Sequence, residues 1–220
     1  VNRSNKGSYG KLLILAGSKQ MAGAAVFAAK AAYRMGCGLV RVATVEENRI
    51  ILQEQVPEAV LAVYNNGTDV VEFVETQLHW ADAVVAGPGI SQSDLSERML
   101  YELLKRIQVP CLCDADALNL LAREKELLQK RSCQVIVTPH VGEMCRLTGR
   151  TKQEITGDLI GTCRSFAREN GVICVLKDAR TVISDGREVC INQTGCSGMA
   201  TGGSGDVLTG LLTGLLAQGM

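Results

Sequence analysis

The segment from Thr194 to Gly210 of this 220-residue chain concentrates glycine around a single carboxylic acid. It reads TGCSGMATGGSGDVLTG, and Asp206 falls where a helix is expected to begin. Consecutive backbone N–H groups at the start of a helix bind anions, and the helix dipole strengthens this binding. A carboxylate beside them can orient a hydroxyl group and accept its proton while the amides stabilise a phosphoryl group in transfer. The segment therefore predicts phosphoryl-transfer chemistry.

A purely structural interpretation of the same segment is a helix whose first turn holds an ordinary stabilising acid. The density of small residues between Gly198 and Gly210 argues against this interpretation. The chain contains neither a Walker A loop nor the dinucleotide motif G-x-G-x-x-G. A hydride-transferring Rossmann enzyme is therefore disfavoured. Because a helix N-terminus favours the ionised form of an acid, we expect a low pKa for Asp206.

Four apolar, strand-like runs end in residues suited to contact with a ligand, at positions 16–18, 87–89, 114–116 and 138–140. In open α/β sheets, ligands bind beyond the carboxyl ends of the strands. Taken singly, each of these could be an ordinary turn of Gly, Pro and Asp. Four together predict a binding site along one edge of a sheet.

Strand and helix signals alternate along the chain, which is typical of an α/β fold with a mainly parallel central sheet covered by helices on both faces. We expect strands at 11–16, 39–44, 60–63, 83–86, 110–113, 134–137 and 172–176, and helices at 22–35, 46–55, 68–78, 93–107, 117–129, 152–170 and 203–217. A β-hairpin of 181–184 and 188–192 around an Asp-Gly turn precedes the glycine-rich loop. In the last helix, small residues at 209, 210, 213 and 214 predict close packing against a neighbour.

We interpret residues 1–220 as one domain, because the length suits one large α/β unit. Val1 and Met220 are interpreted as cuts in a longer protein. Lys plus Arg equal Asp plus Glu at 23 each, so no basic excess predicts binding to nucleic acid or to a membrane. The nine cysteines include no C-x-x-C pair. We expect reduced thiols in a cytoplasmic protein, with Cys111 and Cys113 on opposite faces of a strand.

The run from Gly198 to Gly210 resembles the signature of the ADP/ATP-dependent NAD(P)H-hydrate dehydratases, which have a ribokinase-like fold. Other matching segments are NKGSYGK at 5–11, LAGS at 15–18, MAGAA at 21–25, GCGLV at 36–40, GPG at 87–89, DADAL at 114–118, TPHVGE at 138–143, and LK at 176–177 with Thr181. The resemblance covers nearly the whole chain. Two departures are Cys196-Ser197, where the family often has Asn-Pro, and an end at Met220 ahead of the family's C-terminal helices.

The resemblance implies repair of hydrated NADH or NADPH. A nucleotide, ADP rather than ATP, would phosphorylate the ring hydroxyl, and loss of phosphate would restore the reduced cofactor. Asp206 would prepare the hydroxyl, and Gly203, Ser204 and Gly205 would form the anion hole. The nucleotide would contact Lys177, Asp178, Ala179, Arg180, Thr181 and Gly205, and the hydrated ring would contact Ala25, Gly89, His140 and Asp206. Glu143 would hold Mg²⁺, directly or through water, with Asp114 as a second candidate.

The residues are also compatible with two other functions. A small-molecule hydroxyl kinase of the same fold needs the same anion hole and aspartate, although the Met-Ala-Thr-Gly-Gly and Thr-Pro-His segments favour the dehydratase. A non-catalytic nucleotide-binding module is less favoured because Asp206 is intact. As partners, the resemblance implies an NAD(P)H-hydrate epimerase, which could be fused ahead of Val1, and a homo-oligomer.

Overall fold

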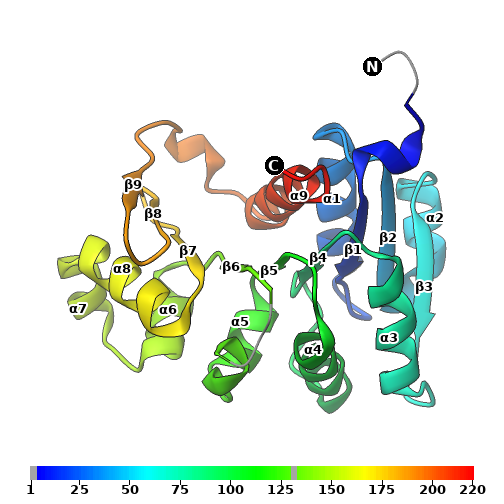
Figure 1. Ribbon diagram of the computed structural model, residues 1–220, viewed down its shortest axis with the longest axis horizontal. Helices are drawn as coiled ribbons and strands as arrows, with labels where there is room; N and C mark the ends of the chain where they lie inside the picture. Colours follow the sequence, from blue (N-terminus) through cyan, green and yellow to red (C-terminus); the bar gives the residue numbers. More distant parts are fainter. Residues whose placement is uncertain (1–3, 130–132) are drawn as a thin grey trace.

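A single twisted sheet forms the centre of the computed structural model, which describes residues 4–129 and 133–220 (Figure 1). The strand order is β3-β2-β1-β4-β5-β6-β7-β8-β9. The strands are β1 Lys11–Leu15, β2 Leu39–Val45, β3 Val60–Tyr64, β4 Ala83–Ala86, β5 Cys111–Cys113, β6 Val135–Val137, β7 Ile173–Leu176, β8 Val182–Ser184 and β9 Val189–Ile191. Strands β1 to β7 pair in parallel, and β8 and β9 add an antiparallel hairpin. The predicted mainly parallel sheet is confirmed.

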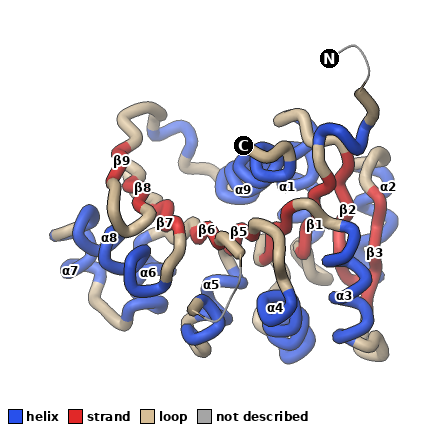
Figure 2. Tube along the Cα trace, in the orientation of Figure 1, coloured by secondary structure: helices blue, strands red, loops and turns tan. Residues whose placement is uncertain are grey.

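The central strands are apolar on both faces because helices cover both sides of the sheet. One face carries α1 Ala22–Arg34, α2 Arg49–Gln55 and α9 Ser204–Ala217. The other carries α3 Val70–Trp80, α4 Asp94–Arg106, α5 Asp116–Leu121, α6 Val141–Thr148, α7 Lys152–Gly157 and α8 Leu159–Asn170. Figure 2 shows these two layers on either side of the strands. Short 3₁₀ turns are Lys6–Tyr9, Glu46–Asn48, Lys125–Leu128 and Ser197–Met199.

Helix α9 lies directly against α1, with small residues at the contact, as the sequence predicts (Figure 1). A Cβ atom on Gly210 would lie 2.2 Å from the carbonyl oxygen of Ala28, so only glycine permits this approach. Thr209, Thr213 and Gly214 are also buried, whereas the leucines between them are only partly covered. The two backbones therefore hold the start of α9 at a fixed place over the sheet.

Three predicted helices are divided in the structure. The segment 46–55 forms the 3₁₀ turn Glu46–Asn48 and α2. The segment 117–129 forms α5 and a separate 3₁₀ turn, and the segment 152–170 forms α7 and α8. Asp158 ends α7 with a non-helical backbone, at φ −149° and ψ 73°, and its side chain accepts a hydrogen bond from the N–H of Gly161 at the start of α8. Aspartate competes with helical hydrogen bonding in this way when it caps a new helix.

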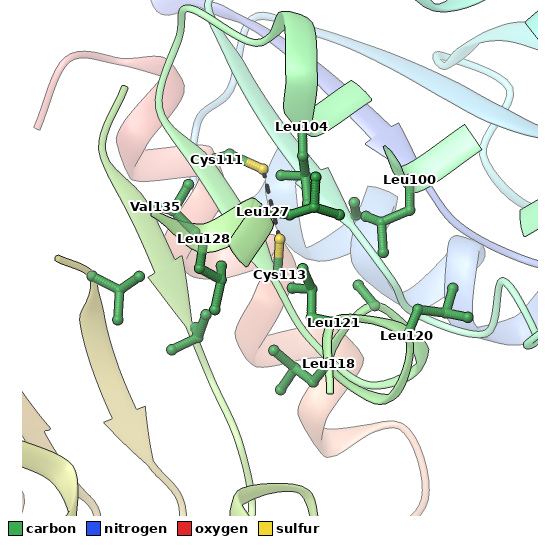
Figure 3. Packing of buried hydrophobic residues seen from close by; sticks show 14 of the residues in the cluster. Leu100, Leu104, Cys111, Cys113, Leu118, Leu120, Leu121, Leu127, Leu128 and Val135 are labelled. Atoms are coloured by element: carbon green, nitrogen blue, oxygen red, sulfur yellow. Dashed lines mark hydrogen bonds between the residues drawn. The ribbon is translucent and has the colours of Figure 1, made fainter. Parts of the chain in front are cut away.

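The expected placement of Cys111 and Cys113 on opposite faces of a strand is wrong. Residues two apart in a strand share a face, and the two sulfur atoms lie 4.0 Å apart. Both are buried among leucines of α4 and α5 (Figure 3). None of the nine cysteines, all of which lie in the described ranges, forms a disulfide. No helix of the described residues has the length and apolar composition needed to cross a bilayer.

Candidate active site

The glycine-rich loop leads into α9 through Gly203, whose φ of +87° favours glycine. A Cβ atom at this position would also lie 2.7 Å from the ring of Phe27 on α1. No side chain caps the start of α9. The backbone N–H groups of Gly205 and Asp206 find no acceptor among the described residues. Unbonded amides at the positive end of a helix dipole can bind an anion, so the predicted anion site is compatible with this geometry and stays a prediction.

Below these amides, Asp114 joins three elements of the fold. Its side chain, 3% exposed, follows β5 and accepts a hydrogen bond from the Lys177 ammonium at 2.9 Å. Its second oxygen accepts one from the Thr209 hydroxyl of α9 at 3.0 Å. A Cβ atom on Gly205 would lie 3.6 Å from this carboxylate and 3.7 Å from the ammonium. The ion pair therefore lies directly beneath the anion-binding amides.

The turn that directs Asp114 toward α9 is strained. Ala115, the next residue, has φ +52° and ψ −120°, a conformation that residues with a Cβ atom rarely adopt. Strain of this kind costs about 1–3 kcal/mol and is found mostly at functional sites. Beyond the turn, Asp116 accepts a hydrogen bond from the N–H of Ser91 at 2.9 Å. The strained Ala115 thus lies between two aspartates with different partners: Asp114 binds the residues after β7 and in α9, and Asp116 binds the loop after β4.

The expected low pKa of Asp206 is wrong. Burial raises the pKa of this carboxyl, the negative charge of Asp114 raises it further, and the positive charge of Lys177 lowers it in part. Desolvation and a like charge therefore outweigh the helix dipole. No hydrogen bond from any other described residue holds the Asp206 carboxylate. A carboxylate with a raised pKa and no protein donor is a better proton acceptor.

His140 begins α6 and takes part in a capping box. Its Nδ1 accepts hydrogen bonds from the N–H groups of Gly142 at 2.9 Å and Glu143 at 3.2 Å. Since Nδ1 is an acceptor, these bonds assign the proton to Nε2. Burial lowers the pKa of His140, and the charges of Lys177 and Arg146 lower it further. The imidazole is half exposed beside Lys177, and its Nε2 lies 3.4 Å from Oε1 of Glu143.

Glu143 completes the capping box, because one of its oxygens accepts the N–H of His140 at 2.9 Å. Burial raises the pKa of its side chain, 6% exposed, to about 7. Among the described residues, no group of three His, Cys, Asp or Glu side chains could enclose a metal ion. Both oxygens of Asp114 already bind protein donors, so this second candidate does not fit direct metal coordination. One oxygen of Glu143 accepts the His140 N–H and the other lies 3.4 Å from His140 Nε2, so binding of Mg²⁺ by Glu143, directly or through water, stays a prediction.

The predicted site residues fall into two groups in the structure. His140, Lys177, Gly205 and Asp206 surround Asp114, as the preceding contacts and charge interactions show. Ala25 instead lies in the first turn of α1, and Gly89, which follows β4, lies against the start of the same helix. A Cβ atom on Gly17 would be 3.2 Å from that of Ala25, and one on Gly89 would be 2.9 Å from that of Met21.

The segment predicted to contact the nucleotide follows β7 along the same edge of the sheet. Its first side chain, Lys177, turns inward to Asp114, and Asp178, Ala179 and Arg180 are exposed. Thr181 accepts a backbone hydrogen bond from Asn192 at 2.9 Å, which ties this segment to the strand that leads into the glycine-rich loop.

Sequence reasoning missed the central position of Asp114 and the contact of Phe27 with Gly203. A signal for the first was present, because an acid that ends a buried strand needs a cation or several donors nearby. The sequence did not show which lysine or hydroxyl would supply them.

Comparisons with known proteins give a consistent result. Residues 12–220 match a family model described as NAD(P)H-hydrate dehydratase. The bifunctional NAD(P)H-hydrate repair enzyme of Moorella thermoacetica is 39% identical over 226 residues, which cover 98% of this chain and 42% of that protein. The ADP-dependent (S)-NAD(P)H-hydrate dehydratase of Lactiplantibacillus plantarum is 34% identical, with 98% and 75% covered. The chain thus spans less than half the length of the bifunctional relatives.

Solved structures agree with these matches. The ADP/ATP-dependent NAD(P)H-hydrate dehydratase of Bacillus subtilis, co-crystallised with ATP and Mg²⁺, superimposes with a TM-score of 0.84 at 32% identity, covering 99% of this chain and 76% of that one. A hydroxyethylthiazole kinase from Pyrococcus horikoshii has a TM-score of 0.63 at 17% identity and covers 96% of this chain and 73% of that one, which shows a shared fold alone.

Proposed function

The chain belongs to the NAD(P)H-hydrate dehydratase family, and from that premise we propose that it converts hydrated NADH or NADPH back to the reduced cofactor at the expense of a nucleotide. One observation carries the proposal. The carboxyl of Asp206, whose pKa is raised, lies in the first turn of α9. Beside it are the unbonded backbone N–H groups of Gly205 and Asp206, and below it is the Lys177–Asp114 ion pair. This arrangement supplies a proton acceptor, an anion site and a cation within one small region.

The anion site would act on the phosphoryl group in transfer. Amides of Gly205 and Asp206 would donate hydrogen bonds to its equatorial oxygens, and the Lys177 ammonium would offset the charge of the donor phosphates. Phosphoryl transfer passes through a loose transition state in which positioning and charge stabilisation matter most. Fixed backbone amides provide both without rearrangement. We propose ADP as the donor, in keeping with relatives named ADP-dependent.

Asp206 would act on the acceptor. The ring hydroxyl oxygen forms a bond to phosphorus, the bond from phosphorus to the nucleotide breaks, and the hydroxyl proton passes to the Asp206 carboxylate. Phosphate then leaves with the electrons of its bond to the ring, assisted by the lone pair of the ring nitrogen. Loss of a ring proton restores the dihydronicotinamide. The imidazole Nε2–H of His140 would orient the ring.

A magnesium ion would reach the site with the nucleotide, held by Glu143 through water. When bound, it supplies positive charge to the donor phosphates. Glu143 itself positions the start of α6 and thereby His140. Because several relatives are bifunctional repair enzymes, we also propose that an epimerase for the hydrated cofactor works with this chain. Homo-oligomer formation and a cytoplasmic location stay predictions.

The direct test is to incubate hydrated NADH with the protein, Mg²⁺ and either ADP or ATP. The expected result is recovery of the dihydronicotinamide absorbance, faster with ADP, with one phosphate released per cofactor restored. A small-molecule kinase would instead leave a stable phosphoester, and a non-catalytic module would consume no nucleotide. Absence of recovery with both nucleotides would overturn the proposed function.

A further inference from the structure

The hydroxyl oxygen of Thr138 is buried and has no hydrogen-bond partner among the described residues. Thr138 follows β6 and its whole side chain is inaccessible to solvent. A buried hydroxyl without a partner lowers stability, because it has lost its hydrogen bonds to water and gained none in the protein. One explanation for such a group is a partner that it binds only during function.

The course of β6 places this hydroxyl on the face of the sheet that α9 covers. Val137 packs in the core beneath α3 to α8, whereas Ile136 packs against the core beneath α1 and α9. Side chains alternate along a strand, and Pro139 keeps the residue before it extended. The ladder also continues beyond β6, since the N–H of Thr138 donates to the carbonyl of Cys113 at 3.3 Å. Thr138 therefore faces α9, as Ile136 does.

Asp114 is the neighbour of Thr138 in the sheet. Cys113 of β5 pairs with Val137 of β6, so the residues that follow them are in register. Asp114 points to the same face, because its carboxylate accepts the Thr209 hydroxyl of α9. Neighbouring strands lie about 4.8 Å apart, and a threonine side chain can rotate between staggered positions. The carboxylate of Asp114 is therefore an acceptor within reach of the unpartnered hydroxyl.

The ion pair of Lys177 and Asp114 crosses β6. Lys177 follows β7, and β6 lies between β7 and β5 (Figure 1). The two side chains together span two strand spacings, about 10 Å, and meet at a distance of 2.9 Å. His140, which follows β6, forms a parallel bridge with Lys177. In this arrangement the lysine ammonium supplies a donor to Asp114, and the hydroxyl of Thr138 has none of the bonds available to it.

Nucleotide binding would draw Lys177 away from Asp114. In the proposed function, the ammonium offsets the charge of the donor phosphates, and its flexible stem lets it turn toward them. The side chain of Asp114 is only 3% exposed, so a charge left there without a donor would be costly. The carboxylate then needs a second donor from the protein, and Thr138 is in register beside it.

We propose that Thr138 is a positioning residue whose hydroxyl replaces the Lys177 ammonium on Asp114 when that ammonium binds phosphate. The inference rests on the proposed function, since it gives Lys177 a second position at the same site. Thr209 keeps its bond to the other oxygen of Asp114, so the carboxylate has two donors in both states. The start of α9 is thereby held in one place with and without nucleotide.

A double-mutant cycle tests this exchange without any ligand. In Lys177→Met the ammonium is absent, so the hydroxyl of Thr138 should bind Asp114. Thr138→Val, which has a similar shape, should raise the urea midpoint of the wild type, because it removes an unpaired buried hydroxyl. The same change should lower the midpoint in the Lys177→Met background.

Thr213→Val is the matched control for the cycle. Thr213 is also a buried threonine on the α9 side of the molecule, but its hydroxyl already donates to the Thr209 carbonyl at 2.7 Å. Its replacement should change the midpoint by the same amount with and without Lys177.

Nucleotide affinity supplies the second test. In titration calorimetry with Mg²⁺, Thr138→Val should weaken ADP binding about tenfold, because the lost hydrogen bond is to a charged group. Thr138→Ser keeps the hydroxyl and should retain the wild-type affinity, as should Thr213→Val. A threonine with a merely structural role would not raise stability and lower affinity when it is replaced by valine.

Two outcomes would overturn the exchange. They are an equal change of the urea midpoint by Thr138→Val in both backgrounds, and an ADP affinity that Thr138→Val leaves unchanged. A wild type that binds ADP but restores no hydrated NADH would instead overturn the proposed function. The two failures are distinguished because the double-mutant cycle needs neither substrate nor nucleotide.

Discussion

The Lys177 ammonium lies 2.9 Å from the carboxylate of Asp114, a residue 63 positions earlier in the chain, and the pair joins the carboxyl ends of β7 and β5. Asp114 also accepts the hydroxyl of Thr209, so a single buried carboxylate connects the donor segment to the helix that carries Asp206. The Lys177–Asp114 pair therefore connects the buried fold to the proposed active site.

Removal of Lys177 should destabilise the protein strongly. Lys177→Met leaves a buried carboxylate without its cation, and such a loss costs about 3–5 kcal/mol. In the double variant Asp114→Asn with Lys177→Met, the loss should be smaller than the sum of the two single losses. Urea unfolding of the four proteins measures the coupling. Additive losses would contradict an energetic role for the pair.

Asp206→Asn should lower turnover about 10²- to 10⁴-fold, because the amide cannot accept the hydroxyl proton. Nucleotide affinity, measured by titration calorimetry, should change little, since the backbone amides of α9 remain. An unchanged unfolding midpoint serves as the control for folding. Retained turnover, or loss of nucleotide binding, would count against the assigned role of Asp206.

The acidic side of the pH profile should report on Asp206. Its pKa is raised by burial and by Asp114, so activity should fall as pH decreases through that raised pKa. Asp114→Asn removes a negative charge, lowers the pKa of Asp206 and should move the acidic limb of kcat/KM to lower pH. Glu72→Gln, on the exposed side of α3, is the matched control and should leave the limb in place. If the acidic side of the kcat/KM profile has the same apparent pKa in Asp114→Asn as in the wild type, Asp206 is not the base.

Ala115→Gly should raise the free energy of unfolding by about 1 kcal/mol. Glycine relieves the strain at φ +52°, estimated at about 1–3 kcal/mol, and this gain exceeds its entropic cost of about 0.5–1 kcal/mol. Ala122→Gly, at an ordinary helical φ of −61°, should lower stability instead. Chemical denaturation of both variants provides the comparison, and a loss of stability in both would show that Ala115 is not strained.

Gly210→Ala should lower stability by about 1–3 kcal/mol, because its Cβ atom would lie 2.2 Å from the Ala28 carbonyl and force α9 away from α1. Gly23→Ala makes the same chemical change at a helical position with open space around it, and should raise stability by about 0.5–1 kcal/mol. Opposite signs in thermal unfolding are the expected result. Equal effects would show that the contact between the helices is unimportant.

Local patterns in the sequence predicted most elements of the sheet, because the apolar strand runs are short and bounded by Gly, Pro or Asp. The strand Ala83–Ala86 and the small-residue side of α9 were predicted as they occur. Helix ends that depend on capping residues were predicted less well than the strands. Asp158 divides one predicted helix, and α6 begins at His140, a residue that rarely acts as a cap.

Long-range contacts explain what the sequence could not predict about the site. The pKa of Asp206 depends on Asp114 and Lys177, which lie far away in the chain. The glycine motif predicts an anion site at the start of α9 but does not indicate the carboxylate beneath it. The family resemblance suggested Ala25 and Gly89 as substrate contacts, and only the structure shows that Ala25 is fully buried against Gly17 and that Gly89 lies against Met21.

The glycine contact between α9 and α1 has a mechanical consequence. Flexible side chains usually lie between two packed helices and adjust to small displacements. At Gly210, no side chain separates the backbone of α9 from the carbonyl of Ala28. A displacement of α1 is therefore expected to move the backbone amides at the start of α9 by a similar amount. Phe27 is exposed on α1 and lies against Gly203, so a substitution at Phe27 would change the spacing of the α9 amides without replacing any residue of the proposed anion site.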